Sequence, residues 1–153
     1  LPGNLPLEAD DQFRILLDNF FKNSLRHGFG NYGEKPGKTI ANENFIIFKI
    51  SHDENTESLC IDMINNGKPF QEEFSFEDFI TLGSYAGNGT GIGGYLMNKI
   101  VLNHGGSLEM PEPGRELVIQ VRDHEKPGQT RSLSTKPGVH FRITIPLNRT
   151  GDE

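Results

Sequence analysis

Two asparagines one helical turn apart are the first residues here whose types and spacing could do chemistry. Asn19 and Asn23 fall on one narrow stripe of a helix expected over residues 10–28, together with Arg26 and with His27 at the edge. A carboxamide oxygen is a suitable ligand for a hard cation when a phosphate shares the ion. The same pattern is typical of a solvated polar helix face, and for this helix alone that interpretation is favoured.

A glycine-rich segment is the second candidate. Residues 87–94 read Gly-Asn-Gly-Thr-Gly-Ile-Gly-Gly, five glycines in eight residues, and a helix is expected directly after them. Glycines let backbone N–H groups approach a polyphosphate, and a helix N-terminus adds unpaired donors and partial positive charge. Residues 89–94 also satisfy the dinucleotide pattern G-x-G-x-x-G, with Glu109 20 residues beyond Gly89. No buried strand leads into the pattern, so dinucleotide binding is kept only as a minor alternative.

The third candidate follows an apolar run at residues 58–64. The segment Asn65-Asn66-Gly67-Lys68-Pro69-Phe70 contains Asn-Gly, which strongly favours a turn. Its functional interpretation is a strand end that presents an amide and bare backbone to a flat ligand.

These residues must be positioned by a small set of helices and strands. Besides the helix over 10–28, we expect a short helix from the capping-box pair Ser75 and Asp78 through Leu82. A further helix over 94–104 would turn Leu96, Ile100 and Val101 inward and stop at Gly105. Strands are expected at 44–50 and 58–64, as a hairpin, and at 116–122 and 139–145, joined by a polar stretch over 123–138.

This order of elements, in a chain of 153 residues, predicts one α+β domain: a two-layer sandwich with a mixed, mostly antiparallel sheet covered on one face by helices. The net charge of −6 argues against a nucleic-acid partner. The single cysteine excludes a disulfide framework and favours a reducing compartment. We therefore expect a cytoplasmic location, without direct membrane contact by this chain.

Taken in order, the three segments resemble the ATP-binding catalytic domain of sensor histidine kinases. That domain belongs to the GHKL superfamily, shared with gyrase, the heat-shock chaperone ATPase and mismatch-repair ATPases. Residues 19–27 are similar to its N box, and residues 65–70 to its first glycine box. Residues 89–94, with the helix ending in His-Gly-Gly at 104–106, are similar to its second glycine box, and 138–146 resemble its closing strand. The resemblance spans about residues 10–147 and implies a Bergerat-type ATP-binding fold over 1–153, with 1–9 as a lead-in.

The resemblance implies roles for individual residues, with Mg²⁺ and ATP as cofactor. Asn23 would hold Mg²⁺ through the ATP phosphates with Asn19 nearby, and Asn65 would face the adenine amino group. Residues 83–93 would form the ATP lid. The remaining nucleotide-binding positions implied in this way are Arg26, His27, Gly67, Phe70, Gly87, Gly89, Thr90, Gly91, Ile92, Gly93 and Gly94.

The resemblance also implies a reaction. Hydrolytic members carry a glutamate as general base where this chain has Asn19, so transfer of the γ-phosphate to a histidine fits better than hydrolysis. The acceptor histidine would lie on a separate dimerisation domain of the same parent protein, with a response regulator downstream. The chain alone would bind nucleotide but transfer phosphate poorly or not at all.

Three positions depart from the family pattern. Asn65 stands where an aspartate is usual, Pro69 replaces the second glycine of that box, and Val139 replaces a threonine. These departures support the alternative of a catalytically weak nucleotide-sensing or partner-binding module. Residues 111–137 are longer than in the family, and the sequence assigns them no function.

Overall fold

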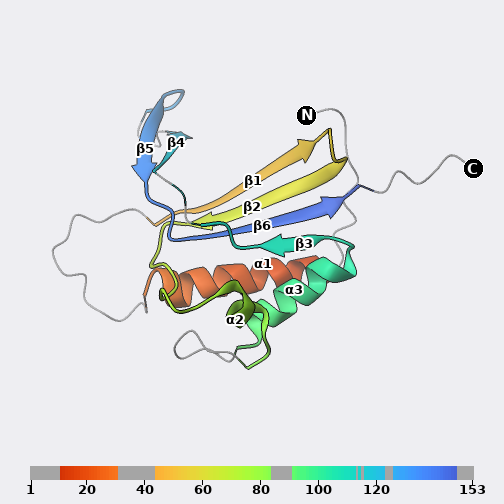
Figure 1. Cartoon of the computed structure of the whole chain (residues 1–153). Helices are drawn as coiled ribbons and strands as arrows, with labels where there is room; N and C mark the ends of the chain where they lie inside the picture. Colours follow the sequence, from red (N-terminus) through yellow and green to blue (C-terminus); the bar gives the residue numbers. More distant parts are fainter. Residues whose placement is uncertain are drawn as a thin grey trace, which may run out of the picture.

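The computed structural model describes residues 11–30, 44–83, 91–112, 114, 116–122 and 126–147. Three α-helices cover one face of a four-stranded sheet, and a separate two-stranded hairpin stands beside it (Figure 1). The expected α+β sandwich is therefore confirmed. The helices are α1 (Asp11–Asn23), which continues into the π-helical turn η1 (Ser24–Gly28), α2 (Phe76–Ile80) and α3 (Gly93–Asn103). The strands are β1 (Ile46–Asp53), β2 (Ser58–Asn65), β3 (Ser107–Glu109), β4 (Leu117–Arg122), β5 (Thr130–Thr135) and β6 (Val139–Pro146).

The main sheet has the strand order β1-β2-β6-β3, and all of these pairs are antiparallel. β1 and β2 form the expected hairpin, with Ile46 opposite Asn65 and Asp53 opposite Ser58. Since side chains alternate across a strand, the same register turns Leu59, Ile61 and Met63 toward the helices. They join Leu16 and Phe20 of α1, Met97 of α3 and Phe141 and Ile143 of β6 in the hydrophobic core.

The helix boundaries follow the local signals closely. Ser75 caps α2: its hydroxyl accepts from the Asp78 N–H, and the Asp78 carboxylate accepts from the Ser75 N–H. This confirms the capping box, although α2 ends at Ile80 rather than Leu82. Gly105 ends α3 with a φ of 69°, a value that glycine adopts without the strain a Cβ would cause.

Two expectations about these elements were wrong, and one strand was not expected at all. Met97, not Leu96, is buried together with Ile100 and Val101, because Met97 lies one turn from both Gly94 and Ile100 on the buried face of α3. The short strand β3 was not expected, and it forms because Leu108 pairs opposite Ile143 at the sheet edge. The stretch 123–138 contains strand β5, whose serine and threonine residues pair with β4 despite their polarity.

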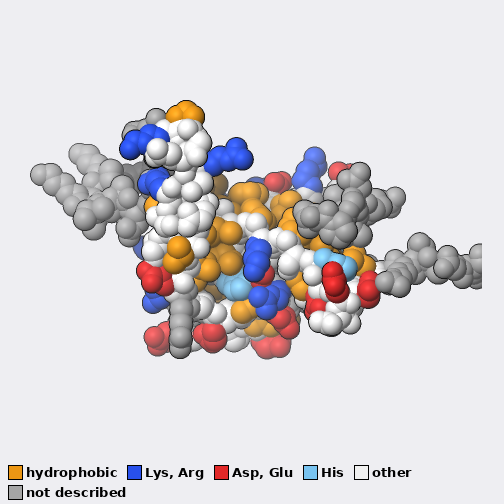
Figure 2. All heavy atoms as spheres, turned by 90° about the horizontal axis from the view of Figure 1, so that it is seen from above, with side chains coloured by type: hydrophobic (Ala, Val, Ile, Leu, Met, Phe, Trp, Pro, Cys, Tyr) orange, Lys and Arg blue, Asp and Glu red, His pale blue; other side chains and the backbone are white. Residues whose placement is uncertain are grey.

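Charged side chains lie among apolar ones on the second face of the main sheet, opposite the helices (Figure 2). The register places Lys49, Asp62, Arg142 and Glu109 in one row across the four strands, with alternating charge. Asp62 is buried, and its Oδ1 lies 2.8 Å from Arg142 Nε and 2.7 Å from His140 Nε2. Burial alone would raise the pKa of Asp62, but hydrogen bonds from His140 and Arg142 outweigh it and hold the pKa below its ordinary value.

Within the described residues, no helix is long and apolar enough to cross a membrane.

Candidate nucleotide-binding site

The N-box helix changes geometry at the residues expected to bind. After Asn23 the backbone widens into η1, where the Phe29 N–H donates to the Ser24 carbonyl at 2.9 Å, a bond five residues long. Single π-helical turns of this kind occur frequently at functional sites. Asn23 and His27 line a cavity beside this turn, whereas Arg26 is exposed and outside its lining. The α-helical stripe expected to hold Asn19, Asn23 and Arg26 together thus does not extend past Asn23.

Asn65 lies at the end of β2, buried in the same cavity wall. Its Oδ1 accepts from the Gly67 N–H at 3.0 Å, and its Nδ2 donates to Ser24 Oγ at 3.0 Å. The Ser24 hydroxyl in turn donates to the Phe20 carbonyl at 2.9 Å. Because the Gly67 N–H is a donor, the atom of the Asn65 amide that faces it must be the oxygen. That oxygen has a second lone pair, which can accept from another donor.

Close backbone packing joins the N box to the first glycine box and the closing strand. A Cβ built on Gly67 would lie 2.5 Å from the Gly28 backbone, and one on Gly138 would lie 1.8 Å from the Gly67 carbonyl oxygen. The Lys68 N–H donates to the Gly28 carbonyl at 2.8 Å, and the Gly138 N–H donates to the Asn65 carbonyl at 2.7 Å. Only glycine fits where these three segments meet, and this contact holds Asn65 against η1.

The second glycine box reaches the N box at the start of α3. A Cβ on Gly93 would lie 3.5 Å from Asn19 Oδ1 and 3.6 Å from Asn23 Nδ2. Helix α3 thus begins directly beside both asparagines. Gly93, expected from the sequence to be the last residue of the ATP lid, is the first residue of this helix. Gly91 has a φ of 64°, and its carbonyl accepts from the Gly83 N–H at 3.2 Å, so the two ends of the predicted lid meet. Gly87, Gly89 and Thr90 lie outside the described residues.

Gly94 has a structural function in this arrangement. A Cβ there would lie 2.0 Å from the Phe79 carbonyl oxygen, so Gly94 allows α3 to pack against α2. The two adjacent glycines therefore differ: Gly93 faces the asparagines, and Gly94 faces the core.

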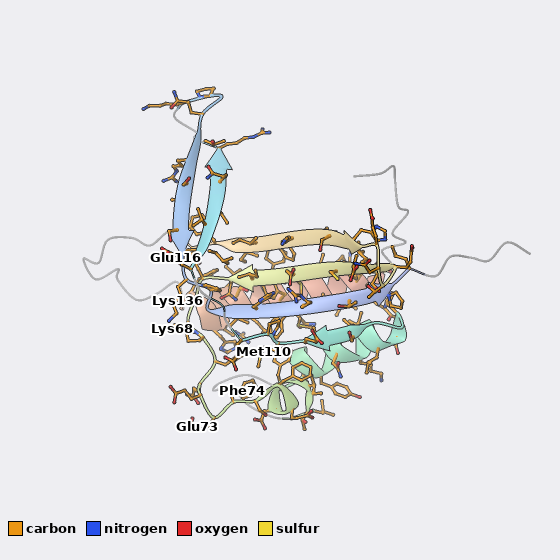
Figure 3. The ribbon with its side chains drawn as sticks, turned by 45° about the horizontal axis from the view of Figure 1, so that its top comes forward. Lys68, Glu73, Phe74, Met110, Glu116 and Lys136 are labelled. Atoms are coloured by element: carbon orange, nitrogen blue, oxygen red, sulfur yellow. The ribbon has the colours of Figure 1, made fainter. Side chains whose placement is uncertain are left out.

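The cavity is a slot of about 240 Å³ between η1, the start of β6 and the segment after β2. Its walls are mainly aromatic and apolar, including Phe20, Phe70, Phe141 and Val139, with the Asn65 amide as a buried polar group. Such a combination, flat apolar walls with few polar groups, suits a heteroaromatic ring that carries one or two hydrogen-bonding edges. Among the described residues, Lys68 is the one lysine or arginine in the lining, and it lies at the end of the sheet near the base of the hairpin (Figure 3).

The sequence alone indicated no nucleotide-binding role for several residues that line the cavity. These are Phe20, Ser24, Gly28, Lys68, Pro69, Gln71, Val139 and Phe141. Lys68 was inside the quoted box, and its charge was an available signal. Nothing in the sequence shows that Ser24 contacts Asn65, which lies 41 positions away.

Among the described residues, no three His, Cys, Asp or Glu side chains come together in a way that could hold a metal. A divalent cation at this site would therefore need carboxamide and phosphate oxygens, which Asn23 and a bound nucleotide can supply.

Comparison with known protein families supports this arrangement. The model of the histidine kinase-, DNA gyrase B- and HSP90-like ATPases matches residues 8–149. A comparison with curated proteins finds no significant match. The chain belongs to the family of histidine kinase-, DNA gyrase B- and HSP90-like ATPases.

Proposed function

We propose that this chain is the Mg-ATP-binding catalytic domain of a two-component sensor histidine kinase. The observation that carries the proposal is the meeting of three segments: the start of α3 at Gly93 lies beside Asn19 and Asn23, next to a cavity with Asn65 in its wall. In this proposal the whole chain is one domain, its core spanning about residues 10–147, and it acts in the cytoplasm.

The adenine base would occupy the aromatic slot. Phe70 and Phe141, with ring centroids 6.3 Å apart, provide flat apolar surface. The free lone pair of Asn65 Oδ1 can accept from the adenine amino group, while the Gly67 N–H and Ser24 hold the amide in place. Guanine presents a carbonyl oxygen at the corresponding position, which would face an acceptor, so the site should prefer ATP.

The triphosphate would extend from the slot toward the start of α3. The first bond within α3 runs from the Leu96 N–H to the Ile92 carbonyl, so the N–H groups of residues 92–95 have no partner within the helix, and such a helix N-terminus favours anions. Asn23 would hold Mg²⁺ through its carboxamide oxygen, and His27 and Arg26 would contact phosphate. The ion would neutralise charge on the transferred group when bound. Gly87, Gly89, Thr90 and Ile92 complete the proposed phosphate-binding set.

Asn19 favours phosphoryl transfer over hydrolysis. Its Nδ2 donates to the Ile15 carbonyl at 3.0 Å, which leaves the amide oxygen on the side of Gly93. A neutral carboxamide cannot take a proton from water at physiological pH, so Asn19 cannot act as the general base that a hydrolytic site has at this position. The acceptor would be a histidine on the dimerisation domain of the parent protein, and the phosphoryl group would pass on to a response regulator.

A catalytically weak nucleotide-sensing or partner-binding module remains the second candidate. The observation in its favour is that both ends of the Asn65 amide already bond to protein groups, Gly67 and Ser24. A neutral acceptor that is shared in this way binds adenine less strongly than a carboxylate would.

Calorimetric titration with Mg-ATP, Mg-GTP and NAD tests the proposal. We expect Mg-ATP to bind most tightly, and Asn23→Ala or Asn23→Asp to remove most of the Mg-dependent affinity. The Asn23 side chain does not cap η1, so its replacement should leave the ligand-free melting temperature nearly unchanged. Asn103→Ala, at the exposed end of α3, is the matched control. Tightest binding of NAD, or unchanged Mg-ATP binding by both Asn23 variants, would contradict the proposal.

A further inference from the structure

The hairpin formed by β4 and β5 is not part of the main body of the domain. Within the described residues its strands pair only with each other, and neither strand contributes a residue to the hydrophobic core. The hairpin projects away from one end of the main sheet, with Glu116 and Lys136 at its base (Figures 1 and 3). An isolated two-stranded hairpin is marginally stable in water, so this one needs a further partner.

Strand β4 has the composition of an inner strand although it lies at an edge. It reads Leu-Val-Ile-Gln-Val-Arg, and Val118 is 65% exposed. Leu117 and Ile119 lie on one face of the hairpin, where Ile119 is opposite Leu133 of β5. A free edge that is apolar and β-branched is a template for another strand, and natural edges usually carry devices that block such pairing.

We propose that the β4 edge pairs with β4 of a second copy of this chain, antiparallel, about a two-fold axis that passes through Ile119. The result would be one four-stranded sheet with the order β5-β4-β4-β5. In this register Ile119 lies opposite Ile119, Val118 opposite Gln120, and Glu116 opposite Arg122 of the other copy. Each pair occurs twice, as a two-fold axis requires.

Side-chain alternation and charge both select this register. Opposite residues in an antiparallel pair point to the same face of the sheet. The apolar faces of the two hairpins therefore join into one surface only when odd-numbered residues of β4 lie opposite odd-numbered residues of the other copy. Of the registers that meet this condition, pairing about Ile119 aligns the whole of residues 116–122 and leaves no position unmatched. It also places an exposed carboxylate opposite an exposed guanidinium at both ends of the new ladder. This self-complementarity indicates a second copy as the occupant.

Charge reversal with cross-rescue tests the proposal. Sedimentation velocity over a concentration series, at low ionic strength where exposed charge pairs are least screened, should show a reversible dimer. Arg122→Glu creates two like-charge pairs by symmetry and should weaken the dimer roughly tenfold, which corresponds to about 1.4 kcal/mol. Glu116→Arg should do the same. An equimolar mixture of the two variants should dimerise again, because every pair in the mixed dimer is of opposite charge.

Two controls make the result specific. Lys126→Glu reverses a charge in the exposed turn of the hairpin, outside β4, and should leave the dimer unchanged. Nucleotide affinity should stay at the wild-type value in all variants, because none of these residues lines the nucleotide cavity. This separates a failure of the dimer from a failure of the proposed function.

A cysteine cross-link provides a second measurement, since Glu116 also accepts a hydrogen bond from the Ser134 hydroxyl and its replacement weakens the hairpin itself. With Cys60→Ser, Ile119→Cys should oxidise to a disulfide-linked dimer, because directly opposite residues lie about 4.5–5.5 Å apart between Cα atoms, within reach of a disulfide. Ser132→Cys on β5 should not cross-link. A wild-type chain that stays monomeric, an Arg122→Glu chain that dimerises as wild type, or equal cross-linking at both positions would overturn the proposal.

Discussion

At the scale of single residues, the most informative contact is the one between Asn65 and Ser24. The sequence alone does not show what the NH₂ group of Asn65 bonds to. The structure provides Ser24 Oγ at 3.0 Å, so the amide is paired at both ends without a ligand. Leaving that NH₂ group unpaired would cost about 1–3 kcal/mol.

Base selectivity is the first prediction at this scale. Asn65→Asp should keep or improve ATP binding, because the carboxylate still accepts from Gly67 and the Ser24 hydroxyl can turn to donate to it. Wild type and Asn65→Asp should prefer ATP over GTP roughly tenfold, the effect of a bond worth about 1.4 kcal/mol. Asn65→Leu should lose that preference. Calorimetry with both nucleotides checks this, and equal affinities throughout would mean that Asn65 does not contact the base.

Asp62 provides a second residue-scale prediction, on stability. Its pKa is lowered in the folded protein from the ordinary 3.8, so ionised Asp62 stabilises the fold above that value. The stabilisation is lost as the pH falls below about 3.8, toward the folded-state pKa. Asp62→Asn should melt at a lower temperature than wild type near neutral pH, and the gap should narrow in acid. If thermal melts show the same difference in melting temperature between Asp62→Asn and wild type from neutral pH to acid, the pairs of Asp62 with His140 and Arg142 do not stabilise the fold.

At the scale of elements, the two adjacent glycines at the start of α3 have different functions. We expect Gly93 to contribute to nucleotide binding and Gly94 to the stability of the fold. Gly93 faces Asn19 and Asn23 with room for a Cβ at 3.5 Å, whereas Gly94 has only 2.0 Å to the Phe79 carbonyl oxygen. The close packing of α3 on α2 therefore depends on Gly94, and the proposed phosphate contact depends on Gly93.

Matched alanine variants test this separation. Gly94→Ala should lower the free energy of unfolding by about 1–3 kcal/mol, because the added methyl group overpacks the contact with α2. Gly93→Ala should leave stability unchanged or slightly raised, since alanine favours a helix, while Mg-ATP affinity falls roughly tenfold. Thermal melts and calorimetry on both variants check the prediction. A stability loss at Gly93, or wild-type affinity in Gly93→Ala, would contradict it.

Gly91, in the same segment, has a φ of 64°, a conformation that residues with a side chain rarely adopt. Gly91→Val should therefore be strained and should abolish triphosphate binding while the core stays folded. Far-ultraviolet circular dichroism together with calorimetry would distinguish loss of binding from loss of the fold. Wild-type affinity in this variant would mean that the segment is only a flexible connection.

At the scale of the whole molecule, the hairpin of β4 and β5 is an addition to the core domain. Replacing residues 117–135 by an Asn-Gly turn should leave the melting temperature close to wild type, because the core, as far as the structure describes the chain, contains no residue of β4 or β5. The bond from Asn66 Nδ2 to Thr135 Oγ1 at 3.0 Å would be lost. Thermal melts of the shortened chain check this, and a large destabilisation would show that the hairpin supports the core.

The sequence alone determined those features of this protein that depend on local pattern. The capping box at Ser75, the stop at Gly105, the β1–β2 hairpin and the α+β class follow from residue periodicity and turn chemistry, which act over a few positions. The short strand β3 and the polar strand β5 did not, because each forms only through its partner strand.

The candidate site likewise combines features that local sequence pattern predicts with features that depend on tertiary contacts. Its boxes could be found in the sequence by their amides and glycines, but only the tertiary structure decided which residues meet. It brought Ser24 to Asn65, His27 rather than Arg26 to the cavity, and Gly93 to the two asparagines. The physical reason is that these contacts depend on the π-helical turn and on the glycine contacts between η1, the segment after β2 and the start of β6. Backbone packing between segments far apart in the chain leaves no periodic signal in the sequence.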